Sequence, residues 1–249
     1  MSFLEVKNVS KTFEEEGRKY TVLGNISFSV EKDEFIAIVG PSGCGKSILL
    51  RILSGIDLPS SGQVLFENEP IETSNPRVAT IFQNFALLPW MTVEENVELG
   101  LYAQKMPSDK RKITVEKFIN IVGLDGVENA YPRELSGGMK QRVGIARALA
   151  VDPALIVMDE PFSSLDSLTA TNLREELLLL LQDQSLPPDS LVMVTHNIEE
   201  AVYMADRIIV LSNPPARIIA QLKISLPRPR DMKSEAFVND VDKVYSLMT

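Results

Sequence analysis

The chain has 249 residues, of which 45% are hydrophobic, and it carries a net charge of −9 at pH 7. This length suits one large domain, or one domain with an inserted subdomain. A single cysteine excludes an intrachain disulfide and fits a reducing compartment. The acidic balance disfavours a nucleic-acid-binding role, because proteins that follow phosphate backbones are usually basic. No apolar run approaches the roughly 18 residues of a membrane-spanning helix, and the N-terminus lacks a signal-peptide layout, so we expect a soluble protein that meets membranes only through partners.

The first expected strands cover residues 3–9 and 25–30, because polar and apolar residues alternate there. Residues 35–39 form an unbroken apolar run rich in β-branched side chains, which is typical of a buried parallel strand. Residues 48–53 carry apolar side chains at helical spacing. The segment between them therefore joins a strand to a helix.

That joining segment matches the phosphate-loop pattern G-x-x-x-x-G-K-[ST] at every fixed position: Gly40-Pro41-Ser42-Gly43-Cys44-Gly45-Lys46-Ser47. Glycines allow several backbone N–H groups to point at one phosphate, and the following helix adds its positive N-terminal end. We expect Lys46 to reach the β- and γ-phosphates, and the Ser47 hydroxyl to ligate Mg²⁺.

Residues 62–67 are expected to form another strand after a turn, and a further short strand ends at residues 81–83. The next segment, residues 84–91, is rich in large apolar groups and holds the only tryptophan, yet it lacks strand or helix periodicity. Two interpretations are equally supported by the residues themselves. The segment is either a buried core loop or a docking surface for another protein.

The pattern from residue 92 to about residue 149 is helical, and Thr92 to Glu95 has the form of a capping box. The basic residues 110–112 lack interleaved aromatics, which favours a solvated helix face over a nucleic-acid site. Ser136, Gly137 and Gly138 then open a helix that runs to residue 149. This helix start is a second potential anion site.

A second buried strand, residues 154–158, is followed directly by Asp159 and Glu160. Carboxylates at this end of a parallel strand lie where ligands bind, so one can hold Mg²⁺ while the other acts as general base on water. Another buried strand, residues 191–195, ends at His196, the only histidine. One more follows at 207–211, and this strand–helix alternation predicts a mostly parallel sheet. A terminal helix is expected through Phe237, Val241, Val244 and Leu247.

Six motifs now stand in one order: the phosphate loop, Gln83, residues 135–139, residues 155–160, residues 164–166 and His196. In this order and spacing the chain resembles the ATP-binding subunit of an ABC transporter over essentially its whole length. The motifs resemble, in turn, the Walker A motif, the Q-loop, the signature motif, the Walker B motif with its catalytic glutamate, the D-loop and the switch histidine.

The resemblance implies an α/β fold, a P-loop NTPase (RecA-like) core with an antiparallel β-subdomain and an inserted helical subdomain. It implies one ATPase domain over residues 1–249. Residues 1–88 would hold the β-subdomain and the phosphate-loop core, residues 89–150 the helical subdomain, and residues 151–249 the rest of the core and a C-terminal helix.

The resemblance also implies that two copies, in this chain's case most simply a homodimer, hold ATP between the phosphate loop of one and the signature motif of the other. Ser136 and Gly138 would contact the γ-phosphate from the opposite copy, and Asp166 would lie at the nucleotide in the D-loop. Gln83 and Asp159 would join Ser47 in positioning Mg²⁺ and the attacking water. Glu160 would polarise that water and His196 would stabilise the γ-phosphate. Phe13 would stack on adenine, with Tyr20 as the alternative.

Two departures from the family pattern concern the phosphate loop. Ile48 stands where the family usually has threonine, so a hydroxyl near the phosphates is lost while the backbone N–H remains, and we expect an effect of roughly 1 kcal/mol. Cys44 lies inside the loop. We therefore expect thiol reagents to block nucleotide binding.

Residues 87–90 and 226–231 are similar to those of the nitrate, sulfonate and taurine importer group. In the family, the segment after Gln83 meets the coupling helix of the membrane subunit, which favours docking for Phe85–Trp90. The resemblance thus implies a peripheral subunit at the cytoplasmic face of the cell membrane. It would power import of a small anion through separate permease subunits, with a solute-binding protein as an indirect partner and no nucleic acid. The alternatives are a soluble ABC-class ATPase switch, a non-hydrolysing ATP-dependent module and an exporter ATPase.

Overall fold

The computed structural model describes residues 2–183 and 186–248. The chain divides into two compact units. The first unit comprises Met1–Asn75 and Ser190–Thr249, and the second unit is Pro76–Asp189. The second unit begins earlier and ends later than the expected helical subdomain at 89–150. In addition to the helices of that range, the unit includes two parallel strands and a long helix after residue 150.

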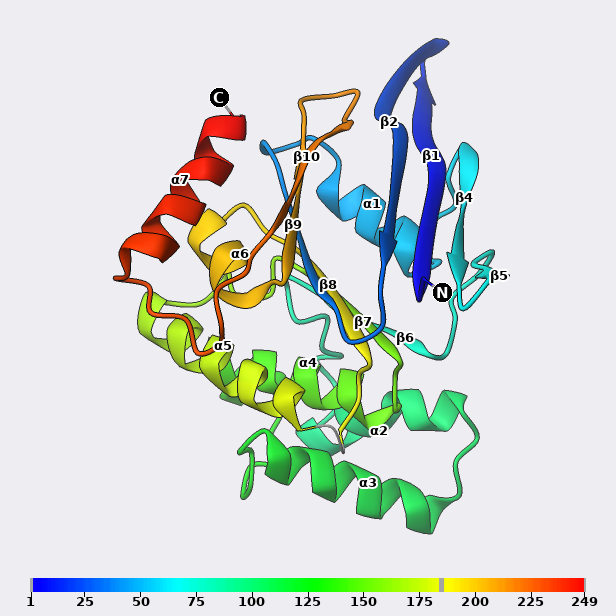
Figure 1. Ribbon diagram of the computed structural model, residues 1–249. Helices are drawn as coiled ribbons and strands as arrows, with labels where there is room; N and C mark the ends of the chain where they lie inside the picture. The colour runs from blue at the N-terminus through cyan, green and yellow to red at the C-terminus, as the bar shows by residue number, and fades with distance from the viewer. Residues whose placement is uncertain (1, 184–185, 249) are drawn as a thin grey trace. The chain divides into compact units, whose positions relative to one another are not determined.

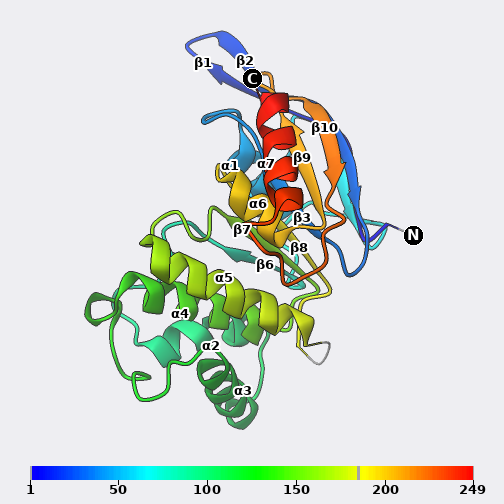
Figure 2. The same cartoon turned by 60° about the vertical axis from the view of Figure 1, so that its left-hand side comes forward.

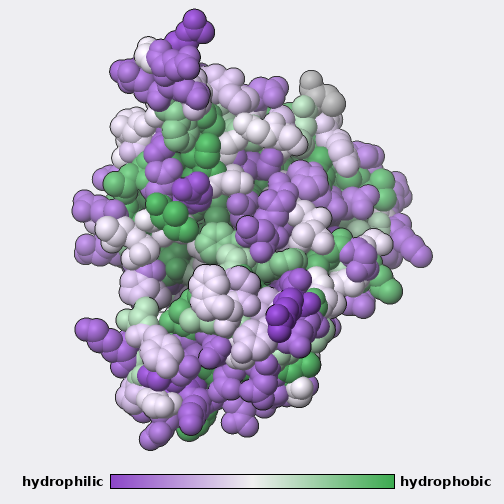
Figure 3. Space-filling view, turned by 180° about the vertical axis from the view of Figure 1, so that it is seen from behind, coloured by the Kyte–Doolittle hydropathy of each residue, from purple (hydrophilic) through white to green (hydrophobic). Residues whose placement is uncertain are grey.

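An antiparallel sheet in the first unit has the strand order β2-β1-β4-β5 (Figure 1). Its strands are β1 (Leu4–Glu15), β2 (Arg18–Val30), β4 (Ser61–Phe66) and β5 (Glu69–Pro70). The β1–β2 hairpin turns at Glu16 and Gly17, whose φ angles of 51° and 76° suit a tight two-residue hairpin turn. The hairpin extends both expected strands, and its projecting tip is covered by hydrophilic side chains (Figure 3).

A second group of strands in the first unit surrounds β3 (Phe35–Val39), which pairs in parallel with β8 (Ser190–Val194) and β9 (Arg207–Leu211). Every residue of β3 and β8 is buried, as the unbroken apolar runs predict. Strand β10 (Ile218–Lys223), which was not predicted from the sequence, pairs antiparallel with β9. The exposed Ile219 obscures the polar–apolar alternation of β10.

Helices α1 (Lys46–Leu53), α6 (Ile198–Met204) and α7 (Glu235–Met248) belong to the first unit. Figure 2 shows α7 beside α6, which it contacts. The buried face of α7 consists of Phe237, Val241 and Val244. The expected terminal helix is confirmed through Leu247, whose side chain is 39% exposed in the last turn.

In residues 76–183 and 186–189, the second unit combines the parallel pair β6 (Val78–Ile81) and β7 (Leu155–Asp159) with four α-helices and one 3₁₀ turn. The helical elements are α2 (Val93–Ala103), α3 (Ser108–Ile121), η1 (Pro132–Glu134), α4 (Gly137–Ala150) and α5 (Ser167–Gln182). Helix α4 contacts α2, α3, α5 and β6, so it forms the core of this unit. The capping box of Thr92 and Glu95 is confirmed at the start of α2.

The basic stretch in α3 is part of a solvated helix, as expected. Lys110 and Lys112 are exposed, and Arg111 donates from Nε to Glu98 Oε1 at 2.7 Å. Within residues 2–183 and 186–248, no helix combines the length and the apolar character that a membrane span requires.

Candidate functional site

The phosphate loop joins the end of β3 to the start of α1 in the first unit. Lys46, the first residue of α1, is buried, and its Nζ donates to the backbone oxygens of Gly40 (2.8 Å) and Pro41 (3.0 Å). The ammonium group therefore lies over the loop that precedes its own helix. From this position a point charge can meet the oxygens of a phosphate that the loop receives.

Gly45 caps α1 with a φ of 104°, a conformation that side-chain-bearing residues rarely adopt. A Cβ at this position would also approach Val22 Cγ1 to 2.7 Å. Because glycine has no side chain to cap the helix, the first N–H groups of α1 keep their donor capacity for an anion. Ser42 is exposed on the loop. In the first turn of α1, Ser47 is exposed and Ile48 is half-buried.

Cys44 is the one loop residue with a fully buried side chain, and burial raises the pKa of its thiol. The thiolate is the form that attacks thiol reagents, so both burial and the raised pKa oppose its modification. This corrects the expectation that such reagents readily block nucleotide binding. The spacing of the motif placed Cys44 in the loop but did not show that its side chain turns inward.

The two aromatic candidates for adenine, Phe13 and Tyr20, are direct cross-strand partners in the β1–β2 hairpin. Their rings stack with centroids 5.7 Å apart and planes 25° from parallel. Tyr20 is 47% exposed and Phe13 is half-buried. The two candidates therefore form one aromatic surface rather than two separate ones.

His196 is exposed in the first unit and lies two residues after the end of β8, after Thr195. The buried Thr195 before it donates from its backbone N–H to the Ile38 carbonyl at 3.2 Å, at the end of β3. The histidine thus begins the turn between β8 and α6. That turn, like the phosphate loop, starts at the carboxyl end of a parallel strand.

In the second unit, Asp159 is the last residue of β7 and Glu160 follows it with a φ of 44°. A positive φ is uncommon for a residue other than glycine and clusters at functional sites. Gln83, predicted from the sequence, donates from Nε2 to Glu160 Oε2 at 3.3 Å. The structure therefore brings together the expected base and the expected Q-loop glutamine.

Two hydroxyl groups complete this cluster. Ser163 Oγ accepts a hydrogen bond from Gln83 Nε2 at 3.1 Å and donates to the Glu160 carbonyl at 3.0 Å. Ser164 Oγ donates to the Gln83 carbonyl at 3.3 Å. No role for Ser163 was predicted from the sequence, and its position between Glu160 and Asp166 is the one local signal that pointed to it.

The signature residues and Asp166 have clear local structural roles. Ser136 caps α4 by accepting from the Met139 N–H at 3.3 Å. A Cβ on Gly138 would come within 2.6 Å of Thr169 Cγ2, so this glycine allows α4 to approach α5 closely. Asp166 caps α5 by accepting from the Thr169 N–H at 3.0 Å, and hydrogen bonds from Thr169 lower the pKa of its carboxyl.

None of the residues from Phe85 to Trp90 is buried, and the Trp90 side chain is 70% exposed. The interpretation as a buried core loop is therefore wrong. The backbone is nevertheless fixed. Arg147 of α4 donates to the carbonyls of Phe85 (2.8 Å) and Ala86 (2.6 Å), and the buried Asn96 of α2 exchanges hydrogen bonds with the backbone of Leu88.

Comparison with known proteins agrees with this arrangement. Residues 23–163 match the ABC transporter family. The chain is 43% identical to an uncharacterised ABC transporter ATP-binding protein of Methanocaldococcus jannaschii, covering 98% of this chain and 91% of that protein. It is 42% identical to the aliphatic sulfonates import ATP-binding protein SsuB of Bacillus cereus, covering 94% of this chain and 91% of the relative.

A third relative is the bicarbonate transport ATP-binding protein CmpC of Synechocystis, at 44% identity over 92% of this chain. The match spans only 34% of the length of CmpC. Among solved structures, the dimeric, post-hydrolysis state of the ATP-binding cassette MJ0796 bound to ADP and Pi superposes with a TM-score of 0.78. That match has 31% identity and covers 90% of this chain and all of the other. The mixed α/β architecture and the P-loop NTPase core are confirmed, and the chain belongs to the ABC transporter family of ATP-binding cassettes.

Proposed function

We propose that this chain is the ATP-hydrolysing subunit of an importer for a small anion, and that it works through separate permease subunits at the cytoplasmic face of a membrane. ATP binding and hydrolysis are the activity of the chain. The single observation that carries the catalytic part is the hydrogen bond from Gln83 to Glu160, directly after β7. This hydrogen bond orients the Glu160 carboxylate, which can act as general base on water. The phosphate loop of the same chain binds the nucleotide that the water attacks.

The residues divide the work on the nucleotide as follows. Lys46 and the loop N–H groups bind the phosphates, and His196 stabilises the γ-phosphate. Glu160 accepts a proton from the attacking water. Ser136 and Gly138 contact the γ-phosphate from a second copy of the chain, and Asp166 lies at the nucleotide in the D-loop. Phe13 stacks on adenine.

The residues also suit Mg²⁺, which prefers oxygen ligands and keeps several waters. Ser47 offers an exposed hydroxyl, Asp159 a carboxylate, and Gln83 an amide oxygen. Both Gln83 side-chain hydrogen bonds described above use Nε2, so neither engages that oxygen. When bound, Mg²⁺ neutralises charge on the phosphate oxygens.

The test replaces the base. Glu160→Gln should lower hydrolysis by about a hundredfold or more and trap bound ATP. Size-exclusion chromatography with light scattering should then show a shift from monomer to dimer on adding Mg-ATP. The matched control is Glu116→Gln, which changes an exposed carboxyl on α3. Hydrolysis by Glu160→Gln at the rate of the control would contradict the assignment.

The permease contact is proposed at Phe85–Trp90. An exposed tryptophan on a backbone fixed by Arg147 and Asn96 is what a rigid docking surface requires, because little order is lost on binding. Trp90→Ala should abolish permease-dependent stimulation of hydrolysis and leave ATP binding unchanged. Tyr245→Ala, which removes another exposed aromatic side chain on α7, is the control. Equal stimulation in both variants would place docking elsewhere.

The anionic substrate class rests on the relatives, whose names refer to aliphatic sulfonates and bicarbonate. Transport measured in vesicles that contain the permease and its solute-binding protein should show ATP-dependent uptake of an alkanesulfonate, taurine, nitrate or bicarbonate. Uptake of none of these anions would contradict the proposed class.

A further inference from the structure

Helix α6 begins two residues after His196 and contains only seven residues. A helix this short is marginal without tertiary support, because nucleation fixes several residues for few hydrogen bonds. The last carbonyl groups of a helix also lack partners within it. Whatever supports the two ends of α6 therefore determines the conformation of the turn that carries His196.

The N-terminal end of α6 is joined to both neighbours of His196. Asn197 caps the helix by accepting from the Glu200 N–H at 3.0 Å. Thr195 Oγ1 donates to Glu200 Oε2 at 2.5 Å and accepts from the Asn197 N–H at 3.0 Å. Thr195 and Glu200 are both buried. The backbone on each side of His196 is thus fixed by the first turn of α6.

The C-terminal end of α6 is held by two arginines from residues 226–231, the segment whose sequence is similar to that of the nitrate, sulfonate and taurine importer group. Arg228 Nη2 donates to the Met204 carbonyl at 2.5 Å. Arg230 Nη1 donates to three more carbonyls, those of Val202 (2.6 Å), Ala205 (2.6 Å) and Tyr203 (3.2 Å). We call Arg228 and Arg230 the arginine clamp.

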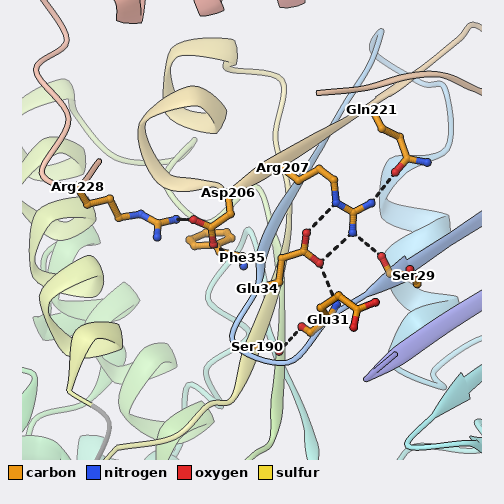
Figure 4. Close-up of polar contacts among 9 residues, drawn as sticks. All are labelled: Ser29, Glu31, Glu34, Phe35, Ser190, Asp206, Arg207, Gln221 and Arg228. Carbon is orange, nitrogen blue, oxygen red and sulfur yellow. Dashed lines mark hydrogen bonds and ion pairs between the residues drawn. The ribbon is translucent and has the colours of Figure 1, made fainter. Parts of the chain in front are cut away.

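The clamp suits this end of the helix electrostatically, because the C-terminus carries partial negative charge. Arg230 is only 6% exposed, and burial lowers its pKa to about 10, which still leaves it protonated at neutral pH. Arg228 also forms an ion pair with Asp206, whose other carboxylate oxygen accepts from the Phe35 N–H at 3.0 Å (Figure 4). The clamp therefore connects α6 to the start of β3.

We propose that the arginine clamp positions His196 for ATP hydrolysis by holding α6 in place. Arg228 and Arg230 are positioning residues, since they act through the helix and not on the nucleotide. The inference rests on the proposed function of His196. Without the clamp, the last turn of α6 loses its capping donors, the Thr195–Glu200–Asn197 hydrogen bonds loosen, and His196 samples several orientations. The phosphate loop lies between β3 and α1, so ATP binding persists.

His196 provides a direct readout, because it is the only histidine in the chain. Histidine labelled with ¹³C gives one imidazole signal by NMR. Arg230→Met should shift, split or broaden that signal, and Arg230→Lys, which keeps the charge but not the fork of donors, should do so less. Val244→Ala, a buried change in α7 of the same unit, is the control for lost stability.

Hydrolysis supplies the second readout. Arg230→Met should lower kcat by roughly ten- to a hundredfold, as for a catalytic group misplaced by about 1 Å, with the KM for ATP within about twofold. If Arg230→Met does not fold, the imidazole signal and kcat are measured in Arg228→Gln and Arg230→Lys, which each keep part of the clamp. An imidazole signal and a kcat that match those of Val244→Ala would overturn the proposal. Wild-type protein without hydrolysis in its assembled transporter would contradict the proposed function instead, and the imidazole signal would still test the clamp.

Discussion

The side-chain amide of Gln83 donates to the Glu160 carboxylate, with 3.3 Å between Nε2 and Oε2. Ser163 Oγ contacts both partners, as acceptor from the same Nε2 at 3.1 Å and as donor to the Glu160 carbonyl at 3.0 Å. Glu160 has a φ of 44°, which costs free energy for a side-chain-bearing residue. The Ser163 hydroxyl therefore stabilises both the backbone of Glu160 and the orientation of Gln83.

Ser163→Ala should lower kcat by about two- to tenfold, since a neutral hydrogen bond contributes about 0.5–1.5 kcal/mol. The KM for ATP should stay unchanged, because the substitution does not alter the phosphate loop. Initial rates of ATP hydrolysis measure both constants. Ser167→Ala, at the exposed start of α5, is the control, and equal rates in the two variants would exclude a role for the Ser163 hydroxyl.

Acid stability should depend on Glu34, which accepts from Arg207 Nε at 2.7 Å and Nη2 at 2.9 Å (Figure 4). Partial burial raises the pKa of the Glu34 carboxyl, but hydrogen bonds from Arg207 and from the Glu31 N–H outweigh it and leave the pKa below 4.5. A depressed pKa in the folded state contributes stability above the unfolded value, and that stability is lost as the pH falls through the folded value.

In Glu34→Gln, the free energy of unfolding should therefore fall less steeply with decreasing pH below 4.5 than it does in the wild type. The measurement is the free energy of unfolding by urea between pH 7 and the acid limit of solubility. Glu14→Gln, an exposed change in the hairpin, should retain the wild-type slope. Parallel curves for wild type and Glu34→Gln would show that the Arg207 pair does not depress the pKa.

The sequence predicted those elements whose signal is local. The apolar runs of β3, β7 and β8 identified buried parallel strands, and the fixed spacing of Gly40–Ser47 identified the phosphate loop. The sequence did not predict the roles of residues whose contacts lie far away in the chain. Arg230 contacts carbonyls 25 to 28 positions earlier, and Ser163 meets an amide 80 positions away. No local periodicity encodes such contacts. The inward orientation of the Cys44 side chain also depends on how the loop folds, so the motif spacing did not predict it.

Cys44 should react slowly with thiol reagents in the folded protein, because its side chain is fully buried and burial raises the pKa of the thiol. Brief treatment with an aromatic disulfide reagent at neutral pH should leave ATP binding intact. The same reagent should titrate one thiol per chain after unfolding in guanidinium chloride. Rapid labelling of the native protein, with loss of ATP binding, would restore the original expectation for this residue.

The stacked pair Phe13 and Tyr20 should bind adenine, because base stacking on an aromatic ring contributes about 1–3 kcal/mol. Phe13→Ala should weaken ATP binding by that amount, and Tyr20→Ala by less, since Tyr20 supports the Phe13 ring across the hairpin. Calorimetric titration with ATP measures the dissociation constants. Inorganic tripolyphosphate, which lacks a base, should bind both variants as it binds wild type.

The titration with tripolyphosphate distinguishes loss of stacking from damage to the phosphate loop, because only damage to the loop would weaken binding of tripolyphosphate. If Tyr20→Ala weakens ATP binding more than Phe13→Ala, the more exposed tyrosine is the stacking partner, which reverses the order of the two candidates. If both variants bind ATP like wild type, adenine recognition does not involve this hairpin. In that case, contacts with the phosphate groups alone would determine the affinity for the nucleotide. GTP and ATP should then bind with the same dissociation constant.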